Sequence, residues 1–110
     1  DVALVGSGSP AIRDGANWHA FYGGEESDDL NARQVAGDIC SRFFDIHGAM
    51  VETNMSEKTL SIEMNKLKQA RYSIGIAMSE EKYSGIVGAL RGKYINRLVT
   101  NSSTAELLLK

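Results

Sequence analysis

Residues 72–99 read YSIGIAMSEEKYSGIVGALRGKYINRLV, and this stretch decides the fold class. Its first seven residues, 72–78, are mostly apolar and predict a strand. Ser79 then supplies a helix N-cap, and the acids Glu80 and Glu81 fall in the first turn, where the helix dipole favours negative charge. Gly92 is suited to a left-handed stop at the other end. The stretch therefore predicts a strand followed at once by a helix.

The predicted helix carries apolar residues on one face, since Tyr83, Ile86, Val87 and Leu90 follow the i, i+3, i+4, i+7 spacing. Residues 94–99 predict the next strand, and Thr-Asn-Ser-Ser at 100–103 caps a closing helix through residue 109. A strand, a helix and a second strand form a parallel crossover, which is right-handed in nearly all proteins. The sequence thus predicts an α/β fold with a largely parallel sheet and flanking helices.

Two glycines, Gly85 and Gly88, lie inside the predicted helix. Each costs about 1 kcal/mol against alanine in a helix interior. They indicate close packing against a neighbouring backbone, although tolerated weak positions explain them equally well.

The first half of the chain adds further elements. The apolar run at residues 2–5 ends at Gly6-Ser7-Gly8-Ser9-Pro10 and predicts a central strand buried on both faces. Segments 38–45 and 49–51 predict an inserted β-hairpin with its turn at residues 46–48. Apolar residues at 60–67 predict one short helix, residues 11–24 a short helix or an ordered loop, and the acids at 25–29 a solvated turn.

Length and composition exclude several classes of protein. The 110 residues suffice for one domain, and the net charge of −2 with a pI near 5.6 gives no electrostatic footprint for nucleic acid. A single cysteine rules out a disulfide framework and a multi-cysteine zinc site. No apolar run reaches the roughly 20 residues of a membrane span. We expect a soluble, cytoplasmic protein with no cofactor and no metal, and, since the sequence begins with Asp1, a fragment of a longer polypeptide.

Three polar or glycine-containing loops follow the predicted parallel strands, at residues 6–9, 79–82 and 100–103. Ligands of open α/β sheets bind at this edge, and backbone amides of such loops suit a phosphate. Lys82 would add a positive charge, unless it is an ordinary surface lysine. Gly6 and Gly8 alone form only part of a dinucleotide fingerprint, and Pro10 argues against it, so nucleotide binding stays a minor alternative.

The reactive side chains support no enzyme from the sequence alone. Cys40 has no sequence-local partner and is interpreted as a small apolar residue on a strand. His47 falls beside Gly48 in a predicted turn and is expected to be exposed, while His19 next to Trp18 either packs or lines a pocket.

Several stretches in order resemble the effector-binding domain of SorC-type bacterial transcriptional regulators. They are DVALVGSG at 1–8, VAGDI at 35–39, RFFD at 42–45 with Gly48, and 85–100 with RGKYIN at its centre. The resemblance runs nearly end to end. It implies an α/β domain related to sugar-phosphate isomerases, preceded by a helix-turn-helix domain, in which phosphorylated sugars or similar metabolites modulate operator binding. Residues 1–110 would be the C-terminal part of that effector domain, and operator DNA would be contacted only through the absent N-terminal domain.

The resemblance also implies site residues. Asp38 matches a carboxylate that accepts hydrogen bonds from ligand hydroxyls, and an ionised carboxylate can accept from two hydroxyls at once. Lys82 matches a lysine that meets a phosphate or polar oxygen, and Gly6 and Gly8 match a ligand-side turn. Cys40, two residues beyond Asp38 on the same strand face, would line the pocket as well. Ser7 departs from the aliphatic residue that is usual there.

Alternatives to the sensing domain stay open at this point. The same type of fold would serve a sugar-phosphate isomerase-like enzyme, which would need an acid/base pair such as Asp38 with His19. A purely structural α/β domain is a further alternative. We also expect a homo-oligomer, because strand edges exposed in a fragment favour association with another chain.

Overall fold

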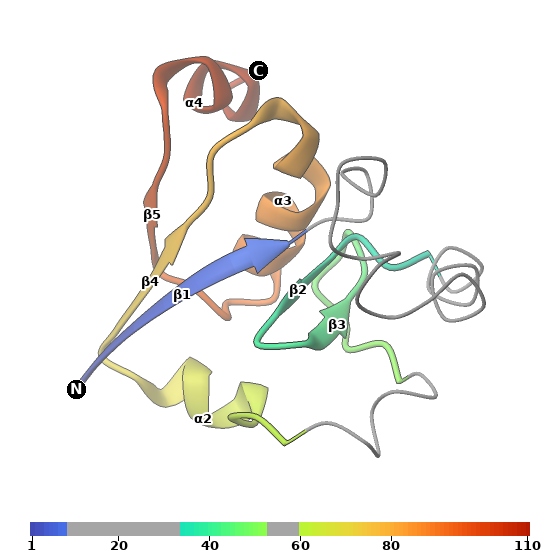
Figure 1. Cartoon of the computed structure of the whole chain (residues 1–110), viewed down its shortest axis with the longest axis vertical. Helices are drawn as coiled ribbons and strands as arrows, with labels where there is room; N and C mark the ends of the chain where they lie inside the picture. Colours follow the sequence, from blue (N-terminus) through green and yellow to red (C-terminus); the bar gives the residue numbers. More distant parts are fainter. Residues whose placement is uncertain (9–33, 53–59) are drawn as a thin grey trace.

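The computed structural model describes residues 1–8, 34–52 and 60–110, and Figure 1 shows their arrangement. Its elements in chain order are β1 (Val2–Gly8), β2 (Gly37–Ile39), β3 (Arg42–Phe44), α2 (Met64–Gln69), β4 (Tyr72–Ile76), the 3-10 turn η3 (Glu80–Lys82), α3 (Tyr83–Arg91), β5 (Arg97–Val99) and α4 (Ser102–Leu108). The predictions for residues 11–24 and for the acidic segment 25–29, with His19, lie outside the described residues.

The described strands form one sheet in the order β3-β2-β1-β4-β5. The strands β1, β4 and β5 are parallel, with Val2 opposite Tyr72 and Ile74 opposite Arg97. The short strands β2 and β3 are antiparallel and join the carboxyl end of β1, where Gly8 lies opposite Asp38. The predicted α/β class, with a largely parallel sheet, flanking helices and an inserted hairpin, is confirmed.

Helices α2 and α3 cover the same face of the sheet. Met64 and Leu67 of α2 share one core cluster with Ala89 of α3, and Ala3 and Val5 of β1 pack against it. The handedness of the connections explains this. The steps from β1 to β4 and from β4 to β5 run in the same direction across the sheet, so right-handed crossovers place both helices on one side.

The opposite face of the sheet is uncovered in the described residues. Val2 and Leu4 of β1 are 61% and 67% exposed. The prediction that the first strand is central is confirmed, because β1 lies between β2 and β4. The prediction that it is buried on both faces is wrong for these residues, since both covering helices lie on the other side.

The hairpin turns earlier than predicted. Cys40 and Ser41 both have positive φ, 53° and 63°, and form the tight turn between β2 and β3. The predicted strand 38–45 is therefore two strands, because the Asp38 carboxylate accepts a hydrogen bond from the Ser41 amide and favours the turn. The predicted turn at 46–48 exists as a second turn. Asp45 caps it, and Met50 beyond it pairs with Phe44 only as an isolated bridge.

The other boundaries differ in smaller ways. Strand β5 begins at Arg97 rather than residue 94, because Tyr94 and Ile95 turn into the core instead. Gly92 does not adopt the left-handed conformation: its φ is −76°, and Lys93 has φ 61°. A side chain at Gly92 would lie 2.4 Å from the ring of Tyr94, so this glycine serves packing. The short helix predicted at 60–67 is α2, which starts at Met64.

Candidate functional site

The candidate site lies where the carboxyl end of β1 meets β2 and the loop after β4. Since β1 and β4 are parallel, their carboxyl ends reach the same edge of the sheet, and β2 joins them there through the pairing of Gly8 with Asp38. Lys82 ends the 3-10 turn η3, which follows β4. The fold thus brings Gly8, Asp38 and Lys82 together from three separate parts of the sequence.

The carboxylate of Asp38 is half-buried and held by backbone amides. Its Oδ2 accepts a hydrogen bond from the Ser41 amide at 3.2 Å, and the Gly8 backbone contributes a second. Burial raises the pKa of Asp38, while the Ser41 amide, the charge of Lys82 and the Gly8 amide oppose this rise. The group is therefore fixed in place and electrostatically coupled to Lys82.

Lys82 is positioned by the capped turn before α3. The predicted cap is confirmed, because the Ser79 hydroxyl accepts a hydrogen bond from the Glu81 amide at 3.2 Å. The Ser79 amide in turn donates to the Thr104 hydroxyl of α4, at 3.2 Å. The turn that presents Lys82 is thus tied to the neighbouring helix. Lys82 itself is half-buried and serves as the N-cap residue of α3.

Three glycines allow α3 to start directly against the strands. A side chain at Gly37 or at Gly85 would place its Cβ 2.6 Å from the carbonyl oxygen of Gly8. A Cβ at Gly88 would lie 2.5 Å from the carbonyl oxygen of Asp45. The predicted close backbone packing of Gly85 and Gly88 is confirmed. This packing keeps the Lys82 turn next to the strand that carries Asp38.

Cys40 and Gly6 lie differently from the expectation. Cys40 is exposed in the tight turn after β2, so its predicted place on the same strand face as Asp38 is wrong. Partial burial and the Asp38 carboxylate raise the pKa of its thiol. Gly6 lies on the uncovered face of β1, and no heavy atom of the described residues lies within 4 Å of a Cβ built there. His47 is exposed, as predicted.

Sequence reasoning missed the backbone groups of the site. The Ser41 amide lies in a segment predicted to be a strand, although Asp38 and Ser41 are residue types common in turns and could have indicated the bend. The contact of Gly37 with Gly85 joins residues far apart in sequence, so no local pattern could reveal it. Ser7 is also unusual: its hydroxyl is buried and has no hydrogen-bond partner among the described residues, and it lies 3.5 Å from a Cβ built at Gly85.

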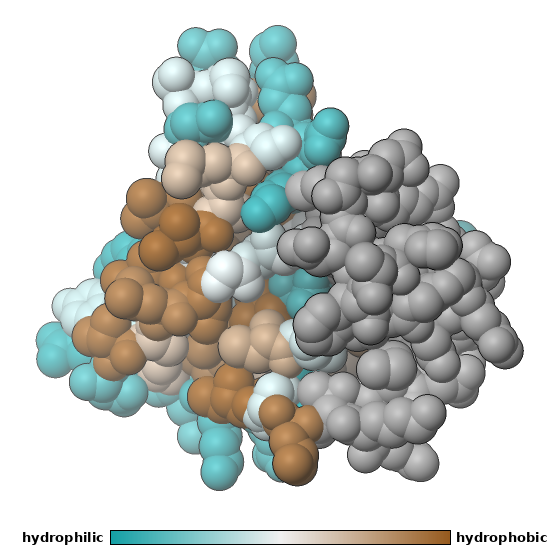
Figure 2. Space-filling view, in the orientation of Figure 1, coloured by the Kyte–Doolittle hydropathy of each residue, from teal (hydrophilic) through white to brown (hydrophobic). Residues whose placement is uncertain are grey.

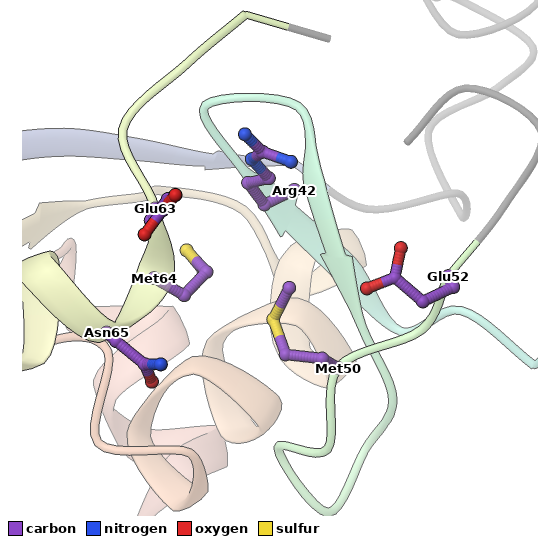
Figure 3. A pocket seen from close by; sticks show the side chains of 6 residues that line it. All are labelled: Arg42, Met50, Glu52, Glu63, Met64 and Asn65. Carbon is purple, nitrogen blue, oxygen red and sulfur yellow. The ribbon is translucent and has the colours of Figure 1, made fainter. Parts of the chain in front are cut away.

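A separate pocket of about 260 Å³ lies between β3, the segment after it and the start of α2 (Figure 3). Its lining is Arg42, Met50, Glu52, Glu63, Met64 and Asn65. The guanidinium of Arg42 donates to the hydroxyl and the carbonyl of Ser61 at 3.0 and 3.3 Å, which ties β3 to the segment before α2. The pocket contains none of the predicted site residues.

Within residues 1–8, 34–52 and 60–110, no three His, Cys, Asp or Glu side chains gather in a group that could hold a metal ion. None of the helices in the described part of the chain combines the length and the apolar character that a membrane crossing needs.

The whole chain, residues 1–110, matches the family model described as "Putative sugar-binding domain". The Sorbitol operon regulator of Klebsiella pneumoniae is 84% identical to it over 110 residues, which are 100% of this chain and 35% of that protein. The chain belongs to the sugar-binding domain family of SorC-type transcriptional regulators. The Deoxyribonucleoside regulator of Bacillus subtilis is 40% identical over 88 residues, which are 80% of this chain and 28% of the regulator.

Solved structures of this sugar-binding domain family agree with the fold. The probable sor operon regulator of Shigella flexneri is 91% identical, with a TM-score of 0.92 over 100% of this chain and 42% of that one. The full-length Sorbitol Operon Regulator SorC of Klebsiella pneumoniae superposes with a TM-score of 0.97 over 100% of this chain and 35% of that one. The chain thus spans about a third of the length of the Sorbitol operon regulator of Klebsiella pneumoniae.

Proposed function

We propose that this domain binds a phosphorylated sugar or a related metabolite at the edge formed by β1, β2 and the loop after β4. The observation that carries the proposal is the half-buried Asp38 carboxylate, held by the Ser41 and Gly8 amides within the field of Lys82. The site thus combines a fixed acceptor for hydroxyls with a cation for a phosphate. A phosphosugar presents both complementary groups.

The roles of the residues follow from their chemistry. Ionised Asp38 accepts hydrogen bonds from two sugar hydroxyls, and Lys82 meets the phosphate or another polar oxygen. Gly8, at the carboxyl end of β1, leaves space for the ligand to approach the backbone, and Gly6 precedes it in the same strand. Cys40 stands in the turn that follows Asp38 and contributes to the rim of the site.

Effector binding in turn modulates operator binding in a longer regulator. The net charge of −2 suits a sensing domain rather than a DNA-contacting one. Operator DNA is therefore bound by a separate N-terminal domain, as the family resemblance implies. The regulator acts in the cytoplasm as a homo-oligomer.

We propose no catalytic role. The relatives are named as transcriptional regulators, and ligand sensing requires no general acid or base. The isomerase alternative needs a proton-transfer partner for Asp38 within hydrogen-bond reach of one substrate. Turnover of sugar phosphates by the purified protein would contradict the sensing role.

The test is thermal unfolding of the chain with a panel of phosphorylated and unphosphorylated sugars. A ligand that binds only the folded state increases the free energy of unfolding, by about 2.7 kcal/mol at a ligand concentration of 100 Kd. The midpoint temperature of unfolding rises as a result. We expect one phosphosugar to raise the midpoint, and expect Asp38→Asn and Lys82→Ala to abolish the increase.

Matched controls replace exposed groups away from the site. Glu106→Gln on α4 and Lys66→Ala on α2 should leave the response intact. If nucleotides stabilise the chain in place of sugar phosphates, or if the Asp38 and Lys82 variants respond like the controls, the proposed site is wrong.

A further inference from the structure

Ser79 lies in the segment between β4 and the turn that carries Lys82, and its backbone is unusual. Its φ is 128° and its ψ is 137°. Residues with a Cβ rarely adopt such a φ, whereas glycine does so readily. A serine keeps this conformation only where the surrounding structure holds it, and strained residues of this kind cluster at binding sites and switch regions. The contacts that hold Ser79 therefore bear on the position of Lys82.

Three hydrogen bonds use all the polar groups of Ser79. Its amide donates to the Thr104 hydroxyl at 3.2 Å, and its own hydroxyl accepts from the Glu81 amide at 3.2 Å. Its carbonyl accepts from the Lys82 amide at 3.1 Å. The bonds with Glu81 and Lys82 are local and shape the turn. The bond to Thr104 reaches a residue 25 positions further along the chain, so it fixes the turn to α4.

Thr104 is itself held firmly in α4. The residue is fully buried, and its amide donates to the side chain of Asn101, the N-cap of this helix, at 3.2 Å. Figure 2 shows mainly hydrophilic and neutral residues over α4, in contrast to the apolar side chains over β1, β4 and β5. A buried hydroxyl is costly without a hydrogen-bond partner. The Ser79 amide supplies that partner, so each of the two residues depends on the other.

Thr104 and Lys82 are thus linked through a single residue. The Thr104 hydroxyl binds the Ser79 amide, and the Ser79 carbonyl binds the Lys82 amide. Without the bond to Thr104, nothing described in α4 would oppose the relaxation of Ser79 to an ordinary backbone conformation. Lys82 would move with Ser79, because its amide is bonded to that residue and only two positions separate them.

We propose that Thr104 is a positioning residue for the candidate site: by holding Ser79 in its strained conformation, it fixes the turn that presents Lys82 near Asp38. Its part in ligand recognition rests on the function proposed above, in which Lys82 meets a phosphate, whereas its part in placing Lys82 does not. Energetic coupling between two places is reciprocal. A ligand that moves Lys82 therefore acts on α4 through the same bonds.

The test uses a full-length chimera, in which this chain replaces the matching 110 residues of the 84% identical Klebsiella pneumoniae regulator. Mass spectrometry follows the acylation rate of the Lys82 amine without ligand, relative to the exposed Lys66 and Lys110. Thr104→Val keeps the shape of the side chain but removes the acceptor. We expect it to raise the Lys82 rate about threefold to tenfold, the factor that loss of one hydrogen bond gives. Ser79→Gly in this background should restore most of the original rate, because glycine adopts a φ of 128° without the bond.

Two further variants separate positioning from general loosening of the fold. Thr104→Ser keeps the hydroxyl and should leave the Lys82 rate unchanged. Thr100→Val removes another buried hydroxyl, which has no hydrogen-bond partner in the described part of the chain, and should also leave the rate unchanged. An equal rise in Thr100→Val and Thr104→Val, or a rise that Ser79→Gly does not reverse, overturns the proposal. A Lys82 rate that Thr104→Val leaves unchanged overturns it as well.

Inorganic phosphate is the probe for the part that Thr104 plays in recognition. It should slow the acylation of Lys82 in the unchanged chimera, and Thr104→Val should raise the phosphate concentration needed for half of this protection severalfold. Equal protection in the two proteins overturns the role of Thr104 in recognition. If phosphate protects Lys82 in neither protein, the phosphate contact of the proposed function is wrong, and the acylation rates without ligand alone decide whether Thr104 positions Lys82.

Discussion

Asp38 shows how a half-buried carboxylate can oppose the stability of the fold that holds it. Burial of its carboxyl group disfavours the charged form, and the two amides and Lys82 do not fully offset this, so its pKa is raised above the ordinary value of 3.8. A carboxyl with a raised pKa binds its proton more tightly in the folded state than in the unfolded one. Its contribution to stability is therefore full below pH 3.8 and is lost as the pH rises through the folded-state pKa.

We predict that Asp38→Asn raises the unfolding midpoint of the ligand-free protein at pH 7. Asparagine keeps the shape and an acceptor for the Ser41 amide but carries no charge to desolvate. The difference from wild type should shrink below pH 4, where Asp38 is protonated in both states. Thermal unfolding from pH 3 to 8 measures this. A variant that is less stable than wild type at pH 7 would show that the amides and Lys82 outweigh burial.

The same ionisation governs ligand binding in the proposed function. Only ionised Asp38 accepts from two hydroxyls, so affinity for the sugar should rise with pH as the group ionises. In the proposed function, Asp38 would therefore serve recognition at a cost in stability, a trade-off known at binding sites.

Helix α3 is fixed by contacts that only glycine permits. Its start rests on the crossing of β1 and β2 through Gly85, and its middle rests on β3 and Asp45 through Gly88. The exposed face of the helix contributes nothing to this fit. The position of the Lys82 turn relative to Asp38 therefore depends on two glycines about one helical turn apart.

We predict that Gly88→Ala lowers the free energy of unfolding by up to about 2 kcal/mol. Overpacking costs about 1–3 kcal/mol, and the better helix propensity of alanine returns about 1 kcal/mol. The added Cβ would lie 2.5 Å from the Asp45 carbonyl oxygen and 2.8 Å from the Phe44 ring, both in well-packed surroundings. Urea denaturation measures the change.

Gly6→Ala is the matched control for this substitution. In the part of the chain that the structure describes, no heavy atom lies within 4 Å of a Cβ added at Gly6, and its backbone is not left-handed. Alanine there should therefore be neutral or slightly stabilising. If Gly88→Ala and Gly6→Ala have the same free energy of unfolding, the prediction is wrong, because α3 can then shift away from the strands at no cost in stability.

At the scale of the whole molecule, Tyr94 joins the elements of the core face. Its hydroxyl donates to the Gly48 carbonyl in the second turn after β3. Its ring lies 5.4 Å from that of Phe44, and the Lys68 Nζ of α2 lies 4.9 Å from the ring centre. One buried side chain thus links the hairpin and α2 to the segment between α3 and β5.

We predict that Tyr94→Phe destabilises the protein by about 1–2 kcal/mol at neutral pH, because the buried Gly48 carbonyl loses its donor. Burial, and to a smaller degree Asp45, raises the pKa of Tyr94 above 10. The contribution of this phenol to stability is full below pH 10 and is lost as the pH rises through its folded-state pKa. The gap between the two proteins should therefore narrow above pH 10, as followed by urea denaturation. A constant gap would mean that Tyr94 does not ionise before the protein unfolds.

The sequence by itself determined the fold class and the outline of the site. Residues 72–99 specify a strand, a capped helix and a second strand through local spacing and capping, which are short-range effects. The right-handed crossover then follows from backbone chirality. Asp38 and Lys82 could be named because the motifs around them resemble those of a family, and the fold does place them at one edge of the sheet.

Only the tertiary structure decided where the hairpin turns, why a glycine stands at position 92 and which face of the sheet is covered. Cys40 and Ser41 adopt left-handed backbone because Asp38 holds the turn, although local preference favours a continuous strand. Gly92 packs against Tyr94 across the core, and no local pattern predicts this contact. The apolar residues of β1 lie on both faces of the strand, so the sequence pattern does not predict which face is buried. The direction of the two crossovers made that choice, because handedness acts on the path of the whole chain.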